Sequence, residues 1–289
     1  MPTIRKVAIW VGITILGMVA VLTLVVGLAL ALAYPKWPDV SELSDYRPKL
    51  PLRVYSAEGI LIGEFGEELR QLTPIAQIPK VMKDAVIAIE DSDFYSHGGI
   101  NYRSMLRAVV ANLGRSKSQG ASTITMQVAR NVYLSSEKSY VRKIYEVLLT
   151  FKLESLLTKD QILEIYMNQI FLGERAYGFA SAAEIYFGKP LKDISIAEAA
   201  MLAGLPKAPS TFNPIVNPSR ARVRQLYIIE RMLDNDFITK EQAVAATKEV
   251  LKLKRDSDTN KSHAEYVSEA VRQLVYAQYG ADTYTKGLN

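Results

Sequence analysis

The stretch Ala88-Ile-Glu90-Asp91-Ser-Asp-Phe94-Tyr-Ser-His97-Gly-Gly99 decides the fold around it. Apolar residues at three- and four-residue spacing precede it from Pro79 onward, which predicts a helix that ends near Glu90. The paired glycines permit backbone angles that other residues resist, so a tight turn is expected to follow. Burial among apolar neighbours would raise the pKa of Glu90 into the range used for general acid–base catalysis. Two solvated acids at a helix end would produce the same pattern.

The composition limits the classes of protein to consider. A chain of 289 residues with 49% hydrophobic content can form one large domain or two small ones around a sizeable core. The net charge of +5 suits an anionic partner, such as a membrane surface or a phosphorylated substrate, and the sequence lacks the basic and aromatic clusters typical of nucleic-acid binding. Without cysteine there is no disulfide and no thiolate zinc site, and the two histidines do not form a metal-binding pair.

Residues 7–34 contain no charged side chain. About 20 such residues span a bilayer, so this segment predicts one transmembrane helix. Arg5 and Lys6 precede it, which predicts a cytoplasmic tail at 1–6 and places the remainder outside. A cleaved signal peptide is the alternative, but its apolar core would be only about half as long. Residues 35–50, rich in proline and acids, predict a juxtamembrane linker.

Beyond this segment the pattern is mainly α. Two short runs, 53–55 and 60–65, predict a small N-terminal β-hairpin as the one β element. Three capping boxes mark helix starts, at Thr158-x-x-Gln161, Ser195-x-x-Glu198 and Thr239-x-x-Gln242. Further helices are predicted at 102–113, 137–157, 159–170, 196–205, 219–235 and 264–280. The apolar helix 102–113 either packs in the core or dips into the outer leaflet of a membrane.

Two helices present polar side chains on one face. Ser122 is expected to cap the first, which places Thr123, Gln127, Arg130 and Asn131 together. Hydroxyls, an amide and an arginine at a helix start suit an anion such as phosphate. A capped helix with a polar solvent face is the alternative.

The second helix, 137–157, aligns cations with a carboxylate. Lys138, Arg142 and Glu146 follow one another at four-residue spacing, and Lys143 lies on the flank. An ordinary ion-pair ladder on the surface has the same spacing. Neither helix identifies a site by itself.

Five ordered motifs together resemble the peptidoglycan glycosyltransferase domain (glycosyltransferase family 51) of class A penicillin-binding proteins. They are Glu90-Asp-Ser-Asp-Phe94-Tyr-Ser-His97-Gly-Gly99, Gly120-Ala-Ser-Thr-Ile-Thr-Met-Gln127, Arg142-Lys143-Ile-Tyr-Glu146, Ile162-Leu-Glu-Ile-Tyr-Met-Asn168 and Glu198-Ala-Ala-Met-Leu-Ala-Gly-Leu-Pro-Lys-Ala-Pro209. The resemblance implies a lysozyme-like, mainly α domain at 51–248 with a membrane-associated jaw subdomain. It also implies that 249–289 is a linker toward a transpeptidase domain, for which this sequence shows no SxxK nucleophile motif accompanied by its partner motifs. We therefore interpret the sequence as part of a bifunctional enzyme of the bacterial inner membrane, with the catalytic domain on the periplasmic side.

The resemblance further implies polymerisation of lipid II, a disaccharide-pentapeptide on a polyprenyl pyrophosphate. Glu90 is the expected general base, and Glu146 matches the second functional carboxylate, which would orient cations or a divalent Mg or Mn ion. Moenomycin-type inhibitors are expected on the donor side. The expected partners are lipid II, the growing glycan strand, the membrane and other cell-wall synthesis proteins. The substrate-binding residues implied are Asp91, Phe94, His97, Arg107, Ser122, Thr123, Gln127, Arg130, Asn131, Lys138, Arg142 and Lys143.

Several positions depart from the family pattern. Met126 stands where a glutamine is frequent, and Tyr145 replaces a frequent lysine, which leaves one cation fewer near the pyrophosphate. Arg130 stands where the family commonly has a lysine, and Lys138 stands where it commonly has an arginine, so both positions keep their positive charge. Two other functions are compatible with parts of the pattern: a lysozyme-like hydrolase or lytic transglycosylase, which also uses two carboxylates, and a non-catalytic membrane-tethered assembly module. Glycan cleavage has no pyrophosphate to stabilise, so the cationic stripe favours the polymerase.

Overall fold

The structure is a computed structural model that describes residues 48–112, 120, 122–134, 140–254 and 265–288, with scattered helical positions between 6 and 27. Within these residues no helix has both the length and the apolar character needed to cross a bilayer. Half of the transmembrane helix predicted at 7–34 and most of the linker predicted at 35–50 lie outside the described part of the chain.

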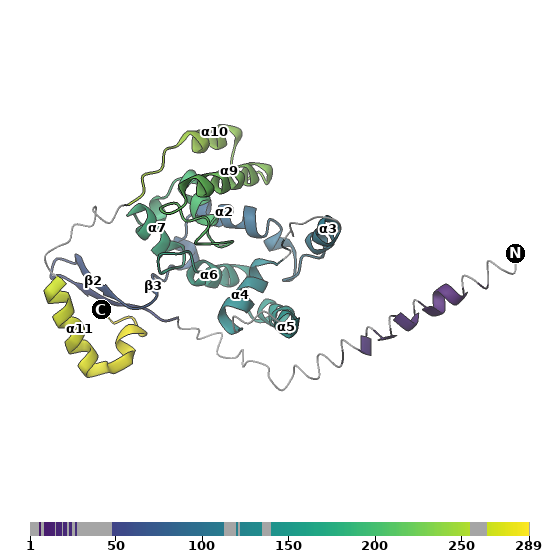
Figure 1. Cartoon of the computed structure of the whole chain (residues 1–289), viewed down its shortest axis with the longest axis horizontal. Helices are drawn as coiled ribbons and strands as arrows, with labels where there is room; N and C mark the ends of the chain where they lie inside the picture. Colours follow the sequence, from purple (N-terminus) through teal and green to yellow (C-terminus); the bar gives the residue numbers. More distant parts are fainter. Residues whose placement is uncertain are drawn as a thin grey trace.

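The described part is mainly helical with two small sheets, which confirms the predicted fold class at that level (Figure 1). The strands are β1 (Leu52–Tyr55), β2 (Leu61–Phe65), β3 (Leu69–Arg70) and β4 (Ala176–Tyr177). The helices are α2 (Lys80–Glu90), α3 (Tyr102–Asn112), α4 (Ile124–Tyr133), α5 (Tyr140–Leu156), α6 (Lys159–Gln169), α7 (Phe179–Phe187), α8 (Ile196–Ala203), α9 (Pro218–Asp234), α10 (Lys240–Lys248) and α11 (Glu265–Tyr279).

One of the two sheets could be predicted from the sequence, and the other could not. Strands β1 and β2 pair antiparallel, as the hairpin prediction requires. Strands β3 and β4 pair in parallel, with Leu69 opposite Ala176 and Arg70 opposite Tyr177. The expectation that the hairpin is the one β element was therefore wrong. A two-residue strand is too short for a periodic pattern, and its partner lies about a hundred residues away.

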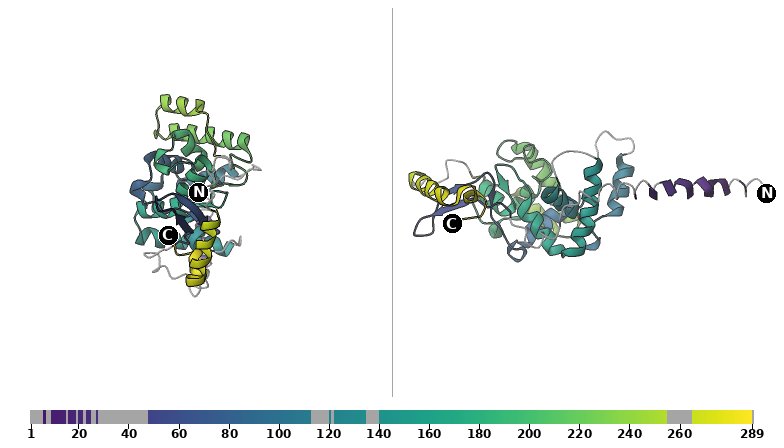
Figure 2. Two further views of the ribbon diagram at one scale, coloured as in Figure 1. Left: turned by 90° about the vertical axis from the view of Figure 1, so that its left-hand side faces the viewer. Right: turned by 90° about the horizontal axis from the view of Figure 1, so that it is seen from below.

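The C-terminal helix packs on the hairpin. Helix α11 lies beside β1 and β2 in all three views (Figures 1 and 2). The backbone N–H of Leu50 donates to Thr285 O at 3.0 Å, and that of Arg53 donates to Leu288 O at 3.1 Å. A side chain at Gly63 would lie 2.6 Å from Cβ of Ser268, so glycine permits this close approach. The predicted division at residue 248 thus separates two segments that contact each other, and the domain boundaries themselves stay a prediction.

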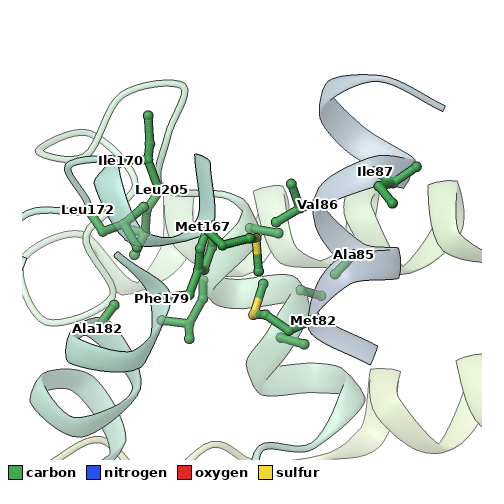
Figure 3. Close-up of a cluster of buried hydrophobic side chains, with 14 of the residues drawn as sticks. Met82, Ala85, Val86, Ile87, Met167, Ile170, Leu172, Phe179, Ala182 and Leu205 are labelled. Atoms are coloured by element: carbon green, nitrogen blue, oxygen red, sulfur yellow. The ribbon is translucent and has the colours of Figure 1, made fainter. Parts of the chain in front are cut away.

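The core holds the end of α2 in place. Met82, Ala85 and Val86 of α2 are fully buried, and they face Met167 of α6 and Phe179 of α7 (Figure 3). Helix α2 also packs against α8 and α9. Each large apolar side chain buried in this way contributes about 1.5–3 kcal/mol. Because α2 is anchored on several sides, the carboxylate at its last residue has a fixed position.

Helix capping agrees with the sequence at three positions and differs at one. Both hydrogen bonds of the capping box are present at Thr158, Ser195 and Thr239. The predicted cap of α4, Ser122, was wrong by one residue: Thr123 is the N-cap, and its hydroxyl oxygen accepts from Met126 N. The Thr123 hydroxyl also donates to Gly99 O at 2.5 Å. This second bond gives Thr123 a buried partner that the sequence pattern does not reveal.

Candidate active site

A cavity of about 640 Å³ opens at the end of α2. Its lining combines the last residues of α2 with the start of α4, a face of α3 and a face of α9. Half of the residues predicted from the sequence line it: Glu90, Asp91, Arg107, Ser122, Thr123, Gln127 and Arg130. The first two motifs therefore meet in one site, although they come from separate elements.

Glu90 is held by its neighbours rather than left in solvent. The amide of Gln127 donates a hydrogen bond from Nε2 to Oε2 of Glu90 at 2.7 Å. Desolvation raises the pKa of Glu90 above its ordinary value, while this hydrogen bond and the charges of Arg224, Arg130 and Lys207 act in the opposite direction. A carboxylate with a raised pKa is a stronger base, and it still ionises when cations lie nearby.

The second acid of the motif has a structural role. Asp91 is 7% exposed, and its carboxylate lies 2.9 and 3.0 Å from Nε2 of His97. It also accepts a hydrogen bond from Ile124 N at 3.2 Å. Together with the bond from Thr123 to Gly99, these contacts fasten the start of α4 to the turn after α2. Asp91 and Thr123 therefore position the site as well as line it.

Phe94 and His97 do not line this cavity. Phe94 is fully buried, with its ring edge-on to Tyr95 and to His97 and with Nζ of Lys159 4.6 Å from its centroid. Phe94 therefore packs in the core next to the turn after α2, and its predicted contact with substrate stays a prediction.

The described members of the predicted cationic stripe, on α5, do not line the cavity. Glu146 is 1% exposed and is absent from the residues that line the cavity. Nζ of Lys143 lies 2.5 Å from its Oε1 and also donates to Oγ of Ser122 at 3.3 Å, and Ser122 does line the cavity. Glu146 is thus connected to the site through Lys143. Arg142 is half-buried on the same helix, and Lys138 lies outside the described residues.

A second cavity of about 620 Å³ adjoins the first. Arg130 and Pro206 line both, so the two cavities share a boundary at the C-terminal half of α4. Asn131, which was predicted to contact substrate, lines the second cavity together with Arg70, Gln169 and Tyr177. The recognised site therefore continues toward β3 and β4.

One wall of the first cavity was missed by the sequence analysis. Lys207, Arg224, Tyr227 and Arg231 come from the segment after α8 and from α9. The last three recur at three- and four-residue spacing and so share one face of α9. That spacing was available in the sequence as a signal, because it places the three side chains on one face of the helix predicted at 219–235.

The described residues do not form a metal site. No group of three or more histidine, aspartate or glutamate side chains in this part of the chain is arranged to hold an ion. The candidate ligand Glu146 is already paired with Lys143. The divalent Mg or Mn ion that the resemblance implies stays a prediction.

Comparison with known proteins agrees with the motifs. The sequence profile of a family described as Transglycosylase matches residues 58–233, and the chain belongs to this family. The chain is 53% identical over 262 residues to penicillin-binding protein 1A of Neisseria lactamica, which covers 90% of this chain and 33% of that protein. It is 45% identical over 254 residues to penicillin-binding protein 1A of Pseudomonas aeruginosa, covering 88% and 31%. The resemblance predicted from the five motifs is thereby confirmed.

A solved structure is also similar. The crystal structure of penicillin-binding protein 1A from Haemophilus influenzae aligns with 84% of this chain and 26% of its own, at 31% identity and a TM-score of 0.47. The chain spans about a third of the length of the curated relatives it matches.

Proposed function

We propose that the chain is a peptidoglycan glycosyltransferase that polymerises lipid II into β-1,4 glycan strands. The observation that carries the proposal is the position of Glu90, which combines a raised pKa with a fixed orientation in a cavity lined by cations. Family membership supports the reaction class. The cavity's arginines and lysine suit a substrate that carries phosphate groups.

The proposed reaction is a single displacement. Glu90 accepts the proton of the acceptor 4-hydroxyl as that oxygen forms a bond to the anomeric carbon of the donor. The bond from that carbon to the lipid pyrophosphate breaks, and the pyrophosphate leaves with the electron pair. The acceptor oxygen attacks the anomeric carbon from the face opposite the leaving pyrophosphate, so the α-linked donor becomes a β-linked product. Arg130, Lys138, Arg142 and Lys143 would neutralise the charge that develops on the leaving group.

Two features of the structure suit a polymer made at a membrane. The second cavity adjoins the reacting centre and offers space for the strand that has already formed. On α3, Tyr102 and Leu106 are 67% and 66% exposed, which suits a jaw that touches the lipid surface. Location in the inner membrane, with the catalytic domain on the periplasmic side, is part of the proposal. Moenomycin-type compounds are expected to compete for the donor side.

The test is polymerisation of labelled lipid II by the purified full chain, with product length measured on gels. Wild type should form long strands, and Glu90→Gln should lower the rate by about a thousandfold, because the base is lost while the shape is kept. Glu230→Gln removes an exposed carboxylate outside the cavity and serves as the matched control. Shortening of finished peptidoglycan without polymerisation would favour the hydrolase or lytic transglycosylase. Absence of both activities in the purified chain would favour the non-catalytic assembly module.

A further inference from the structure

Arg224 is a cation of the cavity wall that the sequence motifs did not predict. It lies on α9, a helix that packs against the Glu90-bearing helix α2. Its guanidinium lies 5.8 Å from the ring centroid of Phe212 and 5.5 Å from that of Tyr227. Stacking of this kind fixes a guanidinium and leaves its charge available, because aromatic rings do not neutralise it.

Part of the Arg224 guanidinium lacks a hydrogen-bond partner. Its Nε is buried and has no hydrogen-bond partner among the described residues. The helix ending at Ala203 is followed by Gly204, where a Cβ would lie 2.9 Å from Cγ of Arg224. The backbone at that point therefore leaves room for the arginine stem. Arg224 is partly buried and forms no ion pair with the described residues, which costs free energy and suggests that its charge serves the cavity.

The charge of Arg224 acts on Glu90. Burial lowers the pKa of Arg224, and the nearby carboxylate of Glu90 acts in the opposite direction. The charge of Arg224 in turn lowers the pKa of Glu90. Both side chains line the same cavity, so this coupling agrees with their placement.

We propose that Arg224 is a positioning residue that keeps Glu90 ionised and able to accept a proton. This inference rests on the proposed function and assigns to α9 a role that none of the five motifs predicts. Gln127 holds the carboxylate by one oxygen, and Arg224 supplies the positive potential that offsets its burial. The arginine does so without forming an ion pair that would block the carboxylate from substrate.

Other charged or titratable groups also influence the carboxylate of Glu90. They are Arg130 on α4, the buried Tyr166 on α6, Lys207 after α8, and the adjacent Asp91, which is paired with His97. Helix α8 also packs on α2, but its acid Glu198 is paired with Lys189. Arg224 is the strongest of the cationic influences on Glu90.

The experiment measures the pH dependence of polymerisation and, separately, the titration of Glu90 itself. The side-chain carboxyl carbons of the full chain are followed by 13C NMR, and the Glu90 signal is assigned by its loss in Glu90→Gln. In Arg224→Gln we expect the Glu90 midpoint and the acidic limb of kcat to move up by about one pH unit. Arg224→Lys keeps the positive charge, so its Glu90 midpoint and its acidic limb of kcat should lie close to those of wild type. The matched control Arg220→Gln removes an exposed arginine of the same helix and should leave both unchanged.

The outcomes separate the two proposals. If wild type polymerises but Arg224→Gln lowers kcat equally at every pH and leaves the Glu90 midpoint in place, Arg224 is structural and the inference is overturned. If wild type fails to polymerise, the proposed function fails, while the NMR titration still tests the coupling. Should Arg224→Gln not fold, Tyr227→Leu removes one stacking ring at a 46% exposed position and should produce a smaller shift in the same direction. An unmoved Glu90 midpoint in Tyr227→Leu would equally count against the proposal, whereas Arg224→Lys, which keeps the charge, should stay close to wild type.

Discussion

The two walls of the cavity differ in how they carry positive charge. On the wall formed by α4, against which α5 packs, Lys143 of α5 contacts both Glu146 and the lining residue Ser122. On the α9 wall, Arg231 pairs with Asp234 at 3.0 Å, but the guanidinium of Arg224 contacts, among the described side chains, only the rings of Phe212 and Tyr227, and Lys207 is exposed. Glu90 lies between the walls and interacts electrostatically with cations from both.

This difference suggests a division of labour. Cations fixed by hydrogen bonds suit a leaving group whose charge appears at one place, because fixed donors need no reorganisation. Cations without such partners act through potential and can tune the base. The α4 wall would then stabilise the pyrophosphate, and the α9 wall would control the proton acceptor. The following changes test this comparison.

The largest expected effect on stability comes from a substitution in the turn that joins α2 to the α4 wall. Gly99 has a φ of +87°, and a Cβ there would lie 2.6 Å from Cγ2 of Thr150 and 2.8 Å from Cγ of Glu154. Gly99→Ala should therefore lower the free energy of unfolding by about 3 kcal/mol, from strain plus overpacking. Urea denaturation measures this. Gly98→Ala is the matched control, because a Cβ at Gly98 meets nothing within 4 Å, and it should change stability by less than about 0.5 kcal/mol.

Next in size is the charge pair of the α4–α5 wall. Lys143→Ala should cost about 2 kcal/mol of stability, because it leaves the buried carboxylate of Glu146 without its cation, while the exposure of Lys143 moderates the loss. Glu146→Gln should cost less, since it removes the charge that needed compensation. The double variant should be more stable than Lys143→Ala alone. If it were less stable, the ion pair would not be the reason for the loss.

The fold was predictable where its cause is local. The capping boxes are complete within four residues, so all three helix starts were predicted correctly. The pairing of β3 with β4 and the packing of α11 on the hairpin depend on segments far apart in the chain. The cap of α4 also depends on such a contact, because the Gly99 carbonyl accepts from Thr123.

The site followed the same rule. The first two motifs carry their chemistry in consecutive residues, and their prediction led to a cavity that contains Glu90, Gln127 and Arg130. Helix α9 carries Arg224 within an ordinary amphipathic pattern, and the tertiary fold alone shows which face meets the cavity. Sequence reasoning also could not show that Phe94 would be buried, because an aromatic next to acids fits either a core or a site.

A smaller effect is expected at the exposed end of the α9 wall. Lys207 lowers the pKa of Glu90 less than Arg224 does. Lys207→Gln should therefore move the acidic limb of kcat upward by only about 0.3 pH unit, because solvent screens an exposed charge. The shift should shrink further when the salt concentration is raised from about 0.05 to 0.5 M. A salt-independent shift as large as that of Arg224→Gln would remove the distinction between the two cations.

The smallest expected effect concerns stability rather than rate. The pKa of Glu90 is raised in the folded state above its ordinary value of 4.5, so the folded protein holds this proton more tightly than the unfolded chain does. The associated stabilisation is fully present below pH 4.5 and is lost as the pH rises through the folded-state pKa. Glu90→Gln removes this loss while its amide can still accept the hydrogen bond from Gln127. The variant should therefore be more stable than wild type at pH 7 and nearly equal to it at low pH. Urea denaturation of both proteins across this pH range measures the difference, and a variant less stable than wild type at pH 7 would show that the cations of the two walls outweigh the burial of the carboxylate.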